Sequence, residues 1–386
     1  MAPQKSAFGN PYWWEAAPRE APTEVSLPPK CDVAIVGAGY TALSAALTLA
    51  RAGRSVVVLD SDAPGQGASS RSGGMIGHGH RISYIELIGR FGAEKAKDLV
   101  REGIASLAFV KALIADEKID AKLQVNGRMR GAWTEAALAS MRSDAAALRR
   151  DFDMPIDDLS KADVQREMAA DVYQGALLFR AHGAVHPALL HQGLLERARE
   201  AGVVVAGFTP VTAVEREGNP AVVHTPRGQI AAGEVVATTN GYSGRALPAL
   251  ARRIVAIPSF MIATEALGEA RVRNLIPNGR MIVETRSTHR YYRPSPDGTR
   301  LVIGGRAALH PIHIDVAARW LMSELSAIFP SLRDVRVSHA WTGNVAFTFH
   351  ALPHTGVMNG MHYALGCTGS RVAVITYMGR ETARRI

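Results

Sequence analysis

The chain has 386 residues, which is enough for two domains or one large composite domain. Its 47% hydrophobic and 20% charged residues are ordinary for a globular soluble protein. The net charge of +9 raises the question of nucleic acid, but arginine is spread along the chain and no basic run is interleaved with aromatic residues. We therefore expect no nucleic-acid partner, and a positive surface that steers anionic ligands toward a cleft.

Residues 1–30 are predicted to form a polar, proline-rich N-terminal arm that is anchored by the hydrophobic patch Tyr12-Trp13-Trp14. The arm lacks the apolar stretch of a signal peptide. The two cysteines, Cys31 and Cys367, show no metal-ligand spacing and cannot build a disulfide framework. We expect a cytoplasmic protein without a metal centre.

Residues 31–60 have the order of a dinucleotide-binding unit: a strand at 33–36, a glycine turn, an apolar helix at 41–51 and a strand at 55–59. Gly37 allows the sharp turn, and Gly39 lets the backbone approach a pyrophosphate, which the helix N-terminus attracts. This stretch is uncharged from residue 33 to residue 50 and is long enough to cross a bilayer, but the glycines favour strand–turn–helix and no membrane span.

Three further features refine this unit. Ala42 stands at the third glycine position, where a methyl group still permits close helix–strand packing. Asp60 closes the second strand, where it would bind a ribose hydroxyl, which favours FAD or NAD over NADP. The glycine- and serine-rich stretch 63–77 is predicted to run against a flat cofactor with Arg71 near the phosphates, although such stretches are also common as flexible surface loops.

Residues 81–159 are predicted to be an inserted, mainly helical segment. The pattern indicates a helix at 85–117, a hairpin turn at Asn126-Gly127 and a helix at 134–149. Ser160 is predicted to cap a helix that begins near Lys161.

Parallel-sheet character returns with a helix at 186–200 and a strand at 203–206. A short antiparallel module (211–228) follows, and then a buried strand from 234 that ends at Asn240-Gly241, where the backbone would approach the cofactor again.

The last third of the chain alternates in the manner of a mostly antiparallel sheet, which would form the floor of a substrate cavity. The expected elements are strands at 259–265, 281–284, 291–293 and 301–304, a helix at 315–328 ended by Pro330, a strand at 335–341, a loop at 352–356, a strand at 361–365 and a closing helix from Val372.

Four segments carry a resemblance to a known family: 36–42 with Asp60, 67–74, 237–242 and 366–372. Together they resemble the FAD-dependent amine oxidoreductases of the D-amino-acid oxidase superfamily, in the branch of γ-glutamylputrescine oxidase-like and glycine/sarcosine oxidase-like enzymes. Shorter stretches extend the likeness over nearly the whole chain: 186–187, 262–265, 292–293, 304–306 and 341–343.

The resemblance implies an α/β fold with a Rossmann-like FAD-binding domain and a second, α+β substrate domain built on a mostly antiparallel sheet. After the arm, residues 31–80, 160–245 and 335–386 are assigned to the FAD-binding domain. Residues 81–159 and 246–334 are assigned to the substrate domain.

The resemblance also implies which residues bind FAD. The first segment would bind the ADP half, the second would line the pyrophosphate and the isoalloxazine, the backbone of Val211 would meet the adenine, and the last would place a helix N-terminus near the flavin pyrimidine oxygens. The implied residues are Gly37, Gly39, Tyr40, Thr41, Ala42, Asp60, Ser61, Ala68, Ser69, Arg71, Ser72, Gly73, Gly74, Met75, Val211, Thr239, Asn240, Gly241, Gly366, Thr368, Gly369 and Ser370.

The chain departs from the family pattern in several places. Ser70 and Ser72 stand where the branch usually has glycine and asparagine, and Arg371 stands where a small residue is common. No lysine follows Lys161, so the lysine that sarcosine-oxidase-like members use to activate O2 has no counterpart. The electron acceptor could thus be O2 or another molecule. No histidine or cysteine stands at the positions that tether flavin in some relatives, so noncovalent FAD is expected.

The reaction implied by the resemblance is oxidation of the C–N bond of a small amine, with the hydride passing to flavin N5 and water hydrolysing the imine. The substrate-site candidates are His78, His80, Tyr292, Arg293, Trp341 and His350, with His354 beside the last of these. Each has an ordinary alternative: a solvated histidine, a surface ion pair for Arg293, or a core position for Trp341.

Two other functions share the first motif. An NAD-dependent dehydrogenase would not need the segments at 237–242 and 366–369, which the extended pose of FAD uses. A catalytically idle FAD-binding protein would fit Arg371 and the missing lysine.

Overall fold

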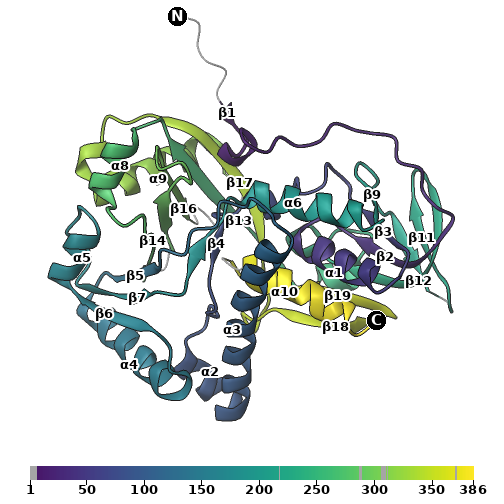
Figure 1. The fold of residues 1–386 in the computed structure, drawn as a ribbon, viewed down its shortest axis with the longest axis horizontal. Helices are drawn as coiled ribbons and strands as arrows, with labels where there is room; N and C mark the ends of the chain where they lie inside the picture. Colours follow the sequence, from purple (N-terminus) through teal and green to yellow (C-terminus); the bar gives the residue numbers. More distant parts are fainter. Residues whose placement is uncertain (1–6, 217, 287–288, 306–309, 311, 370–371) are drawn as a thin grey trace, which may run out of the picture.

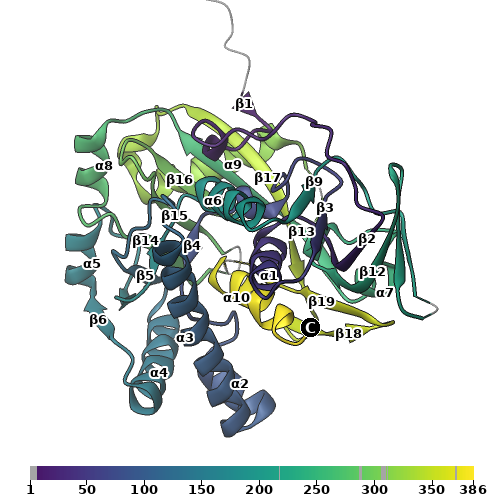
Figure 2. The same ribbon diagram turned by 45° about the vertical axis from the view of Figure 1, so that its right-hand side comes forward.

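A computed structural model describes residues 7–216, 218–286, 289–305, 310, 312–369 and 372–386. Two large sheets organise the two lobes of the molecule, one on either side of the views in Figures 1 and 2. Within the described residues, no helix is long and apolar enough to cross a membrane. The stretch 33–50 is instead the end of a strand, a turn and a helix.

The first sheet has eight strands, of which β12, β2, β3 and β9 pair in parallel. Strands β2 and β3 are buried and almost continuously apolar, as expected for parallel strands that are covered on both faces. The order is β10-β11-β12-β2-β3-β9, and β19 joins β12 and β18. The strands are β2 (Lys30–Val36), β3 (Val56–Leu59), β9 (Val204–Ala206), β10 (Ala213–Glu215), β11 (Ala221–Thr225), β12 (Gly228–Ala237), β18 (His354–Met358) and β19 (Met361–Leu365).

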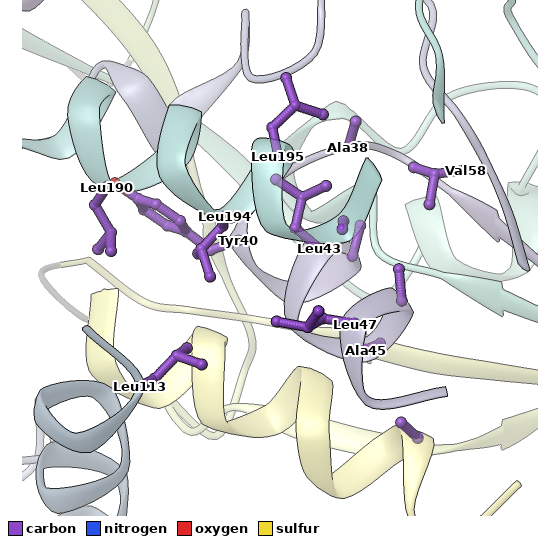
Figure 3. Close-up of a cluster of buried hydrophobic side chains, with 14 of the residues drawn as sticks. Ala38, Tyr40, Leu43, Ala45, Leu47, Val58, Leu113, Leu190, Leu194 and Leu195 are labelled. Atoms are coloured by element: carbon purple, nitrogen blue, oxygen red, sulfur yellow. The ribbon is translucent and has the colours of Figure 1, made fainter. Parts of the chain in front are cut away.

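Helix α1 (Tyr40–Arg51) follows the glycine turn and lies between α6 (Pro187–Glu200) and α10 (Val372–Ala383). Leucines of α1, α6 and α3 (Ala93–Asp116) form the core around it (Figure 3). A Cβ added to Gly379 of α10 would lie 2.2 Å from the carbonyl oxygen of Thr41. The two helices can therefore approach closely only because position 379 is glycine.

The second sheet has nine strands in the order β1-β17-β13-β16-β15-β14-β5-β7-β6. All neighbours are antiparallel except β1 with β17 and β14 with β5. The strands are β1 (Ala7–Phe8), β5 (Arg128–Ala132), β6 (Ile156–Ser160), β7 (Gly175–Phe179), β13 (Val255–Thr264), β14 (Met281–Glu284), β15 (Tyr291–Pro294), β16 (Leu301–Gly305) and β17 (Val337–Phe347).

The remaining elements are shorter or peripheral. Helix α9 (Ile314–Ile328) covers the second sheet and shares its core. Strands β4 (Met75–Ile76) and β8 (Gly183–Ala184) form a small pair. The others are α2 (Tyr84–Phe91), α4 (Glu135–Phe152), α5 (Lys161–Glu167), α7 (Pro248–Ala251), α8 (Glu269–Leu275), and the 3-10 turns η1 (Tyr12–Trp14), η2 (Ala68–Ser70), η3 (Asn240–Tyr242) and η4 (Pro330–Leu332).

The predicted elements are largely present, and the main differences are the following. The helix at 85–117 is interrupted at Gly92, whose φ of +83° ends α2 before α3 begins. The hairpin at Asn126-Gly127 is wrong, because β5 pairs with β7 and β14 instead of folding back on the preceding residues. The predicted loop at 352–356 contains the start of β18, and β17 continues to Phe347.

The sheets divide the chain differently from the predicted domain limits. Strands β7 and β17 both lie in the second sheet. From the sequence, their residues are predicted to belong to the FAD-binding domain, within the ranges 160–245 and 335–386. Helix α3 contributes to the core around α1, although 81–159 was assigned to the substrate domain. These memberships depend on pairings between distant segments. We propose that residues 160–179 and 335–347 belong to the substrate domain.

Candidate cofactor and substrate cavity

A cavity of about 830 Å³ lies between the two sheets. Its lining includes the glycine turn after β2, the end of β3, the loop 65–75 and the turn after β12 from the first lobe. The second sheet contributes residues of β13, β15, β16 and β17. The size is at the upper end of ordinary ligand sites, which run to about 1,000 Å³.

The glycine turn leaves no room for side chains. Gly37 has a φ of +98°, and an added Cβ would lie 3.1 Å from Thr238 Oγ1. At Gly39 an added Cβ would lie 2.8 Å from Ser69 Oγ. No side chain of the N-cap position caps α1, which begins at Tyr40 beside the cavity. The N–H groups of Gly37, Ala38 and Tyr40 already donate to the Leu59 carbonyl, the Asp60 carboxylate and Ser69 Oγ. An anion would therefore be bound by the Gly39 N–H and by the N–H groups that follow Tyr40 in the first turn of α1.

Asp60 joins the end of β3 to the glycine turn. One carboxylate oxygen accepts a hydrogen bond from the Ala38 backbone N–H at 2.6 Å, and the other accepts from the Asp62 N–H at 3.1 Å. Burial raises the pKa of Asp60 to about 6, since desolvation outweighs these hydrogen bonds. Asp60 is one of the residues that line the cavity. An acidic residue at the end of the second strand of such a unit can accept hydrogen bonds from ribose hydroxyls.

Residues 65–69 and 71–75 form one wall of the cavity. Gly74 has a φ of +69°, and an added Cβ would lie 2.2 Å from the Val185 carbonyl oxygen. Arg71 donates from Nε to the Gln66 carbonyl at 2.7 Å and from Nη1 to the Thr342 carbonyl at 3.1 Å. The guanidinium thus ties the loop to β17 while the residue lines the cavity.

Most of the predicted cofactor residues line this cavity. Ala42, Gly241, Gly366 and Thr368 do not: Ala42 and Thr368 are buried, and Gly241 packs against Asn344. Ser370 and Arg371 lie outside the described residues. Those on the lining are Gly37, Gly39, Tyr40, Thr41, Asp60, Ser61, Ala68, Ser69, Arg71, Ser72, Gly73, Gly74, Met75, Val211, Thr239, Asn240 and Gly369.

The residues present fit a bound dinucleotide. The turn at Gly37 and Gly39 is a cradle that a Cβ would fill, the N-terminus of α1 lies beside it, and Asp60 lines the cavity directly after β3. No lysine lines the cavity in the part of the chain that the structure describes.

None of the six substrate-site candidates lines the cavity. His78 is buried with its ring 4.3 Å from that of His182, and burial with the nearby Arg128 charge lowers its pKa to about 3. His80 hydrogen-bonds through Nε2 to the Leu99 carbonyl at 2.6 Å. His350 is exposed, with its ring 5.7 Å from that of His354.

The other three candidates are buried behind the wall. Trp341 donates from Nε1 to the Arg71 carbonyl at 2.8 Å. Arg293 donates to the Val185 carbonyl at 2.7 Å and stacks over Trp13. Because the Val185 N–H donates to the Gly74 carbonyl, Arg293 supports the loop on the side away from the cavity. Tyr292 lies in the core of the second sheet.

Other residues of the second sheet line the cavity instead. They include Ile257, Ser259 and Met261 on β13, Tyr291 on β15, and Phe347 at the end of β17, and His289 and Arg81 lie on the same lining. The three residues of β13 are not among those predicted from the sequence. Their alternation along the strand could have identified them, because every second residue of a strand faces the same side of a sheet. No sequence pattern around Arg81 or Phe347 indicates that they line a cavity. Only tertiary packing brings them together, with the Arg81 guanidinium 5.3 Å from the centroid of the Phe347 ring.

The charged residues on the lining are unevenly placed. Asp60 and Asp62 directly follow β3 of the first sheet. Arg81 lies against Phe347 of the second sheet. Arg71 and Arg245 complete the charged lining among the described residues.

This arrangement belongs to the class of two-lobed enzymes that hold a dinucleotide between a parallel sheet and a second sheet. Residues 32–385 match the sequence profile of the family described as DAO, FAD dependent oxidoreductase, and the chain belongs to this family. The cofactor of the family is FAD, which confirms the resemblance and excludes the NAD-dependent alternative.

The relatives agree with the predicted branch. γ-Glutamylputrescine oxidoreductase of Escherichia coli is 32% identical over 355 residues, which cover 92% of this chain and 83% of that protein. A probable oxidoreductase, OrdL, of Rhizobium meliloti is 30% identical over 376 residues, which cover 95% of this chain and 86% of that protein. The crystal structure of glycine oxidase from Geobacillus kaustophilus superposes with a TM-score of 0.79 at 20% identity, covering 93% and 95% of the two chains. At this level of sequence identity, the similarity to the glycine oxidase structure shows that the two proteins share a fold.

Proposed function

We propose that the protein oxidises the C–N bond of a small primary or secondary amine or amino acid. FAD bound in the cavity would accept a hydride at flavin N5, and water would hydrolyse the resulting imine. The observation that carries the proposal is the continuous cavity, in which the dinucleotide cradle meets a floor formed by Ser259, Met261 and Tyr291. The names of the relatives support amines as the substrate class.

The residues of the chain would mainly bind and orient. The glycine turn and the N-terminus of α1 would hold the pyrophosphate, and Asp60 would accept from the ribose. Met261, Tyr291 and Phe347 would exclude water and hold an uncharged amine against the flavin. This chemistry needs no dedicated base, so orientation is the main task of the protein.

Arg81 supports a substrate that carries a carboxylate. Its guanidinium lies against Phe347 at the second-sheet side of the cavity, whereas both acidic residues of the described lining follow β3. An arginine at such a place can bind a carboxylate through two parallel hydrogen bonds. We therefore favour substrates that carry a carboxylate, such as amino acids, over polyamines.

The electron acceptor and the mode of cofactor binding belong to the same proposal. The absence of a lysine from the described lining supports an acceptor other than O2, so a dehydrogenase is the second candidate. An idle FAD-binding protein is the remaining one. We propose noncovalent FAD, which acid precipitation would release into the supernatant. A cytoplasmic location remains a prediction from the sequence.

A steady-state screen tests the proposal. The purified FAD-loaded protein is incubated with glycine, sarcosine, D-amino acids, γ-glutamylputrescine and N-methylaminobutyrate, once in air and once with an artificial electron acceptor. We expect a carbonyl product from at least one carboxylate-bearing amine. Peroxide in air would identify an oxidase, and turnover only with the artificial acceptor would identify a dehydrogenase. Lack of any product under both conditions would argue for the idle protein.

A further inference from the structure

The N-terminal arm reaches the back of the loops that line the cavity. Its described part begins with β1 at the edge of the second sheet and crosses to β2 of the first sheet (Figures 1 and 2). Between these ends, Trp14 and Arg19 contact the loop that follows β3. Neither residue lines the cavity itself.

Trp14 holds the loop 65–71 at two points. Its Nε1 donates to Ser70 Oγ at 2.8 Å, and that hydroxyl donates to the Gly65 carbonyl at 2.7 Å. The guanidinium of Arg71 lies over the Trp14 ring, 4.5 Å from its centroid. Such a cation–π contact is stronger where the cation is partly withdrawn from water. Trp14 therefore holds the end of the loop at Ser70 and Arg71, and Ser70 links that end to Gly65.

Arg19 reaches the glycine turn through His191 of α6. Its Nη1 lies 3.3 Å from the Pro64 carbonyl and 3.3 Å from His191 Nδ1. His191 Nε2 lies 2.7 Å from the carbonyl oxygen of Ala38, the residue between Gly37 and Gly39. A carbonyl can only accept, so Nε2 carries the hydrogen, and a guanidinium can only donate, so Nδ1 accepts. One neutral tautomer satisfies both contacts.

The environment of His191 keeps this tautomer in place. The ring is fully buried, and an added Cβ at Gly65 would lie within 2.4 Å of it. Burial and the Arg19 charge lower the pKa of His191 to about 4, with Arg199 acting in the same direction and Glu20 opposing; the Tyr40 ring also packs against it. At neutral pH the imidazole is thus an uncharged spacer between the arm, the glycine turn and the 64–71 loop.

We propose that the N-terminal arm is a positioning element for FAD. Arg19, through His191, and Trp14, through Ser70, hold the glycine turn and the 64–71 loop at the spacing that the pyrophosphate requires. The inference rests on the proposed FAD site but not on the identity of the substrate. It predicts that point changes in the arm weaken FAD binding although no arm residue of this network touches the cavity.

The test measures the dissociation constant and the dissociation rate of FAD with purified apoprotein, together with the melting temperature of the apoprotein. His191→Leu and Arg19→Met are expected to raise the dissociation constant about tenfold or more, because each leaves hydrogen-bonding partners at the turn unpaired. Trp14→Phe keeps a ring but loses the N–H, so it is expected to raise the constant by about threefold to tenfold. His191→Gln can donate to the Ala38 carbonyl and accept from Arg19, so it should restore affinity to within about threefold of wild type.

Tyr12→Phe is the matched control. It removes another arm contact, the hydrogen bond from the Tyr12 hydroxyl to Asp297 at 3.2 Å, without reaching the cavity-lining loops. FAD affinity within about twofold of wild type is expected for it. Equal losses in Tyr12→Phe and His191→Leu that follow the apoprotein melting temperature would overturn the proposal, as would wild-type affinity in His191→Leu, Arg19→Met and Trp14→Phe. If wild-type protein itself fails to bind FAD, the proposed function fails first.

Discussion

Tyr291 and Tyr292 are adjacent on β15 and face opposite sides of the second sheet. Tyr291 lines the cavity together with Ser259 of β13. Tyr292 is completely buried in the core on the other side, with its hydroxyl 3.1 Å from that of Tyr173. One side chain of this strand therefore faces the cavity and the next one faces the core.

We predict that Tyr291→Phe and Tyr292→Phe have opposite signatures. Tyr291→Phe removes a polar group from the cavity, so kcat/KM is expected to fall by about threefold to tenfold while stability changes little. Tyr292→Phe removes a buried hydrogen bond, so the free energy of unfolding is expected to fall by about 1 kcal/mol with unchanged kcat/KM. Urea unfolding and steady-state kinetics check both, and a kinetic defect confined to Tyr292→Phe would contradict the assignment.

Asp60→Asn is predicted to weaken FAD binding without destabilising the apoprotein. A charge-assisted hydrogen bond contributes about 1.5–3 kcal/mol, so the loss should be at least about tenfold in affinity. The buried carboxylate is itself unfavourable: its folded pKa of about 6 lies above the ordinary value, so the folded apoprotein loses stability as the pH rises through 6. The melting temperature of Asp60→Asn apoprotein at pH 7.5 should therefore equal or exceed that of wild type.

The same carboxyl group gives FAD affinity a pH dependence. Ribose hydroxyls bind the ionised form better, so binding lowers the pKa of Asp60 below its value of about 6 in the apoprotein. Affinity is expected to be constant above pH 7 and to fall as the pH drops below 6. Titrations between pH 5 and 8 measure this, and Asp60→Asn should flatten the curve. A wild-type curve that is already flat would exclude an ionised Asp60 as the ribose ligand.

Gly74→Ala is predicted to be much more harmful than Gly53→Ala. Both glycines have positive φ, +69° and +81°, so an alanine is strained at either. A Cβ at Gly53 would meet nothing within 4 Å, whereas one at Gly74 would lie 2.2 Å from the Val185 carbonyl oxygen. We expect Gly53→Ala to cost about 1 kcal/mol and Gly74→Ala at least about 2 kcal/mol more, with loss of FAD. Equal unfolding free energies for the two variants would contradict the close approach at Gly74.

Arg81→Gln is predicted to discriminate between substrates. If Arg81 binds a carboxylate, KM for a carboxylate-bearing amine should rise by about tenfold or more, since a charge-assisted pair is lost. An amine without a carboxylate should show a change of less than about twofold. Arg81→Lys keeps the charge but not the planar fork, so an intermediate KM is expected. Equal effects on both kinds of amine would remove Arg81 from the substrate site.

The cofactor half of the cavity could be predicted because its determinants are local in the sequence. Gly37, Gly39 and Asp60 lie within one strand–turn–helix–strand unit, whose spacing fixes where each residue lies. The capping box at Ser160 was predictable for the same reason: its partner, Asp163, is three residues away.

The substrate half could not be predicted in the same way. Arg81 and Phe347 meet only because the sheet and the loop after β4 bring distant segments together. Arg293 and Trp341 have the chemistry of a substrate site, but they serve the wall behind it, where they bind the backbone at Val185 and Arg71. The sequence of β15 does not show whether Tyr291 or Tyr292 faces the cavity, because that depends on how the strand pairs in the sheet.

An anaerobic absorbance titration tests the central claim most directly. FAD-loaded protein is mixed without oxygen with each amine of the panel, and the visible absorption band of the oxidised flavin is followed. Amine oxidation predicts that one carboxylate-bearing amine bleaches the band, with one carbonyl product formed per flavin. A band that every member leaves unchanged, in protein that has bound FAD stoichiometrically, would contradict the proposed reaction.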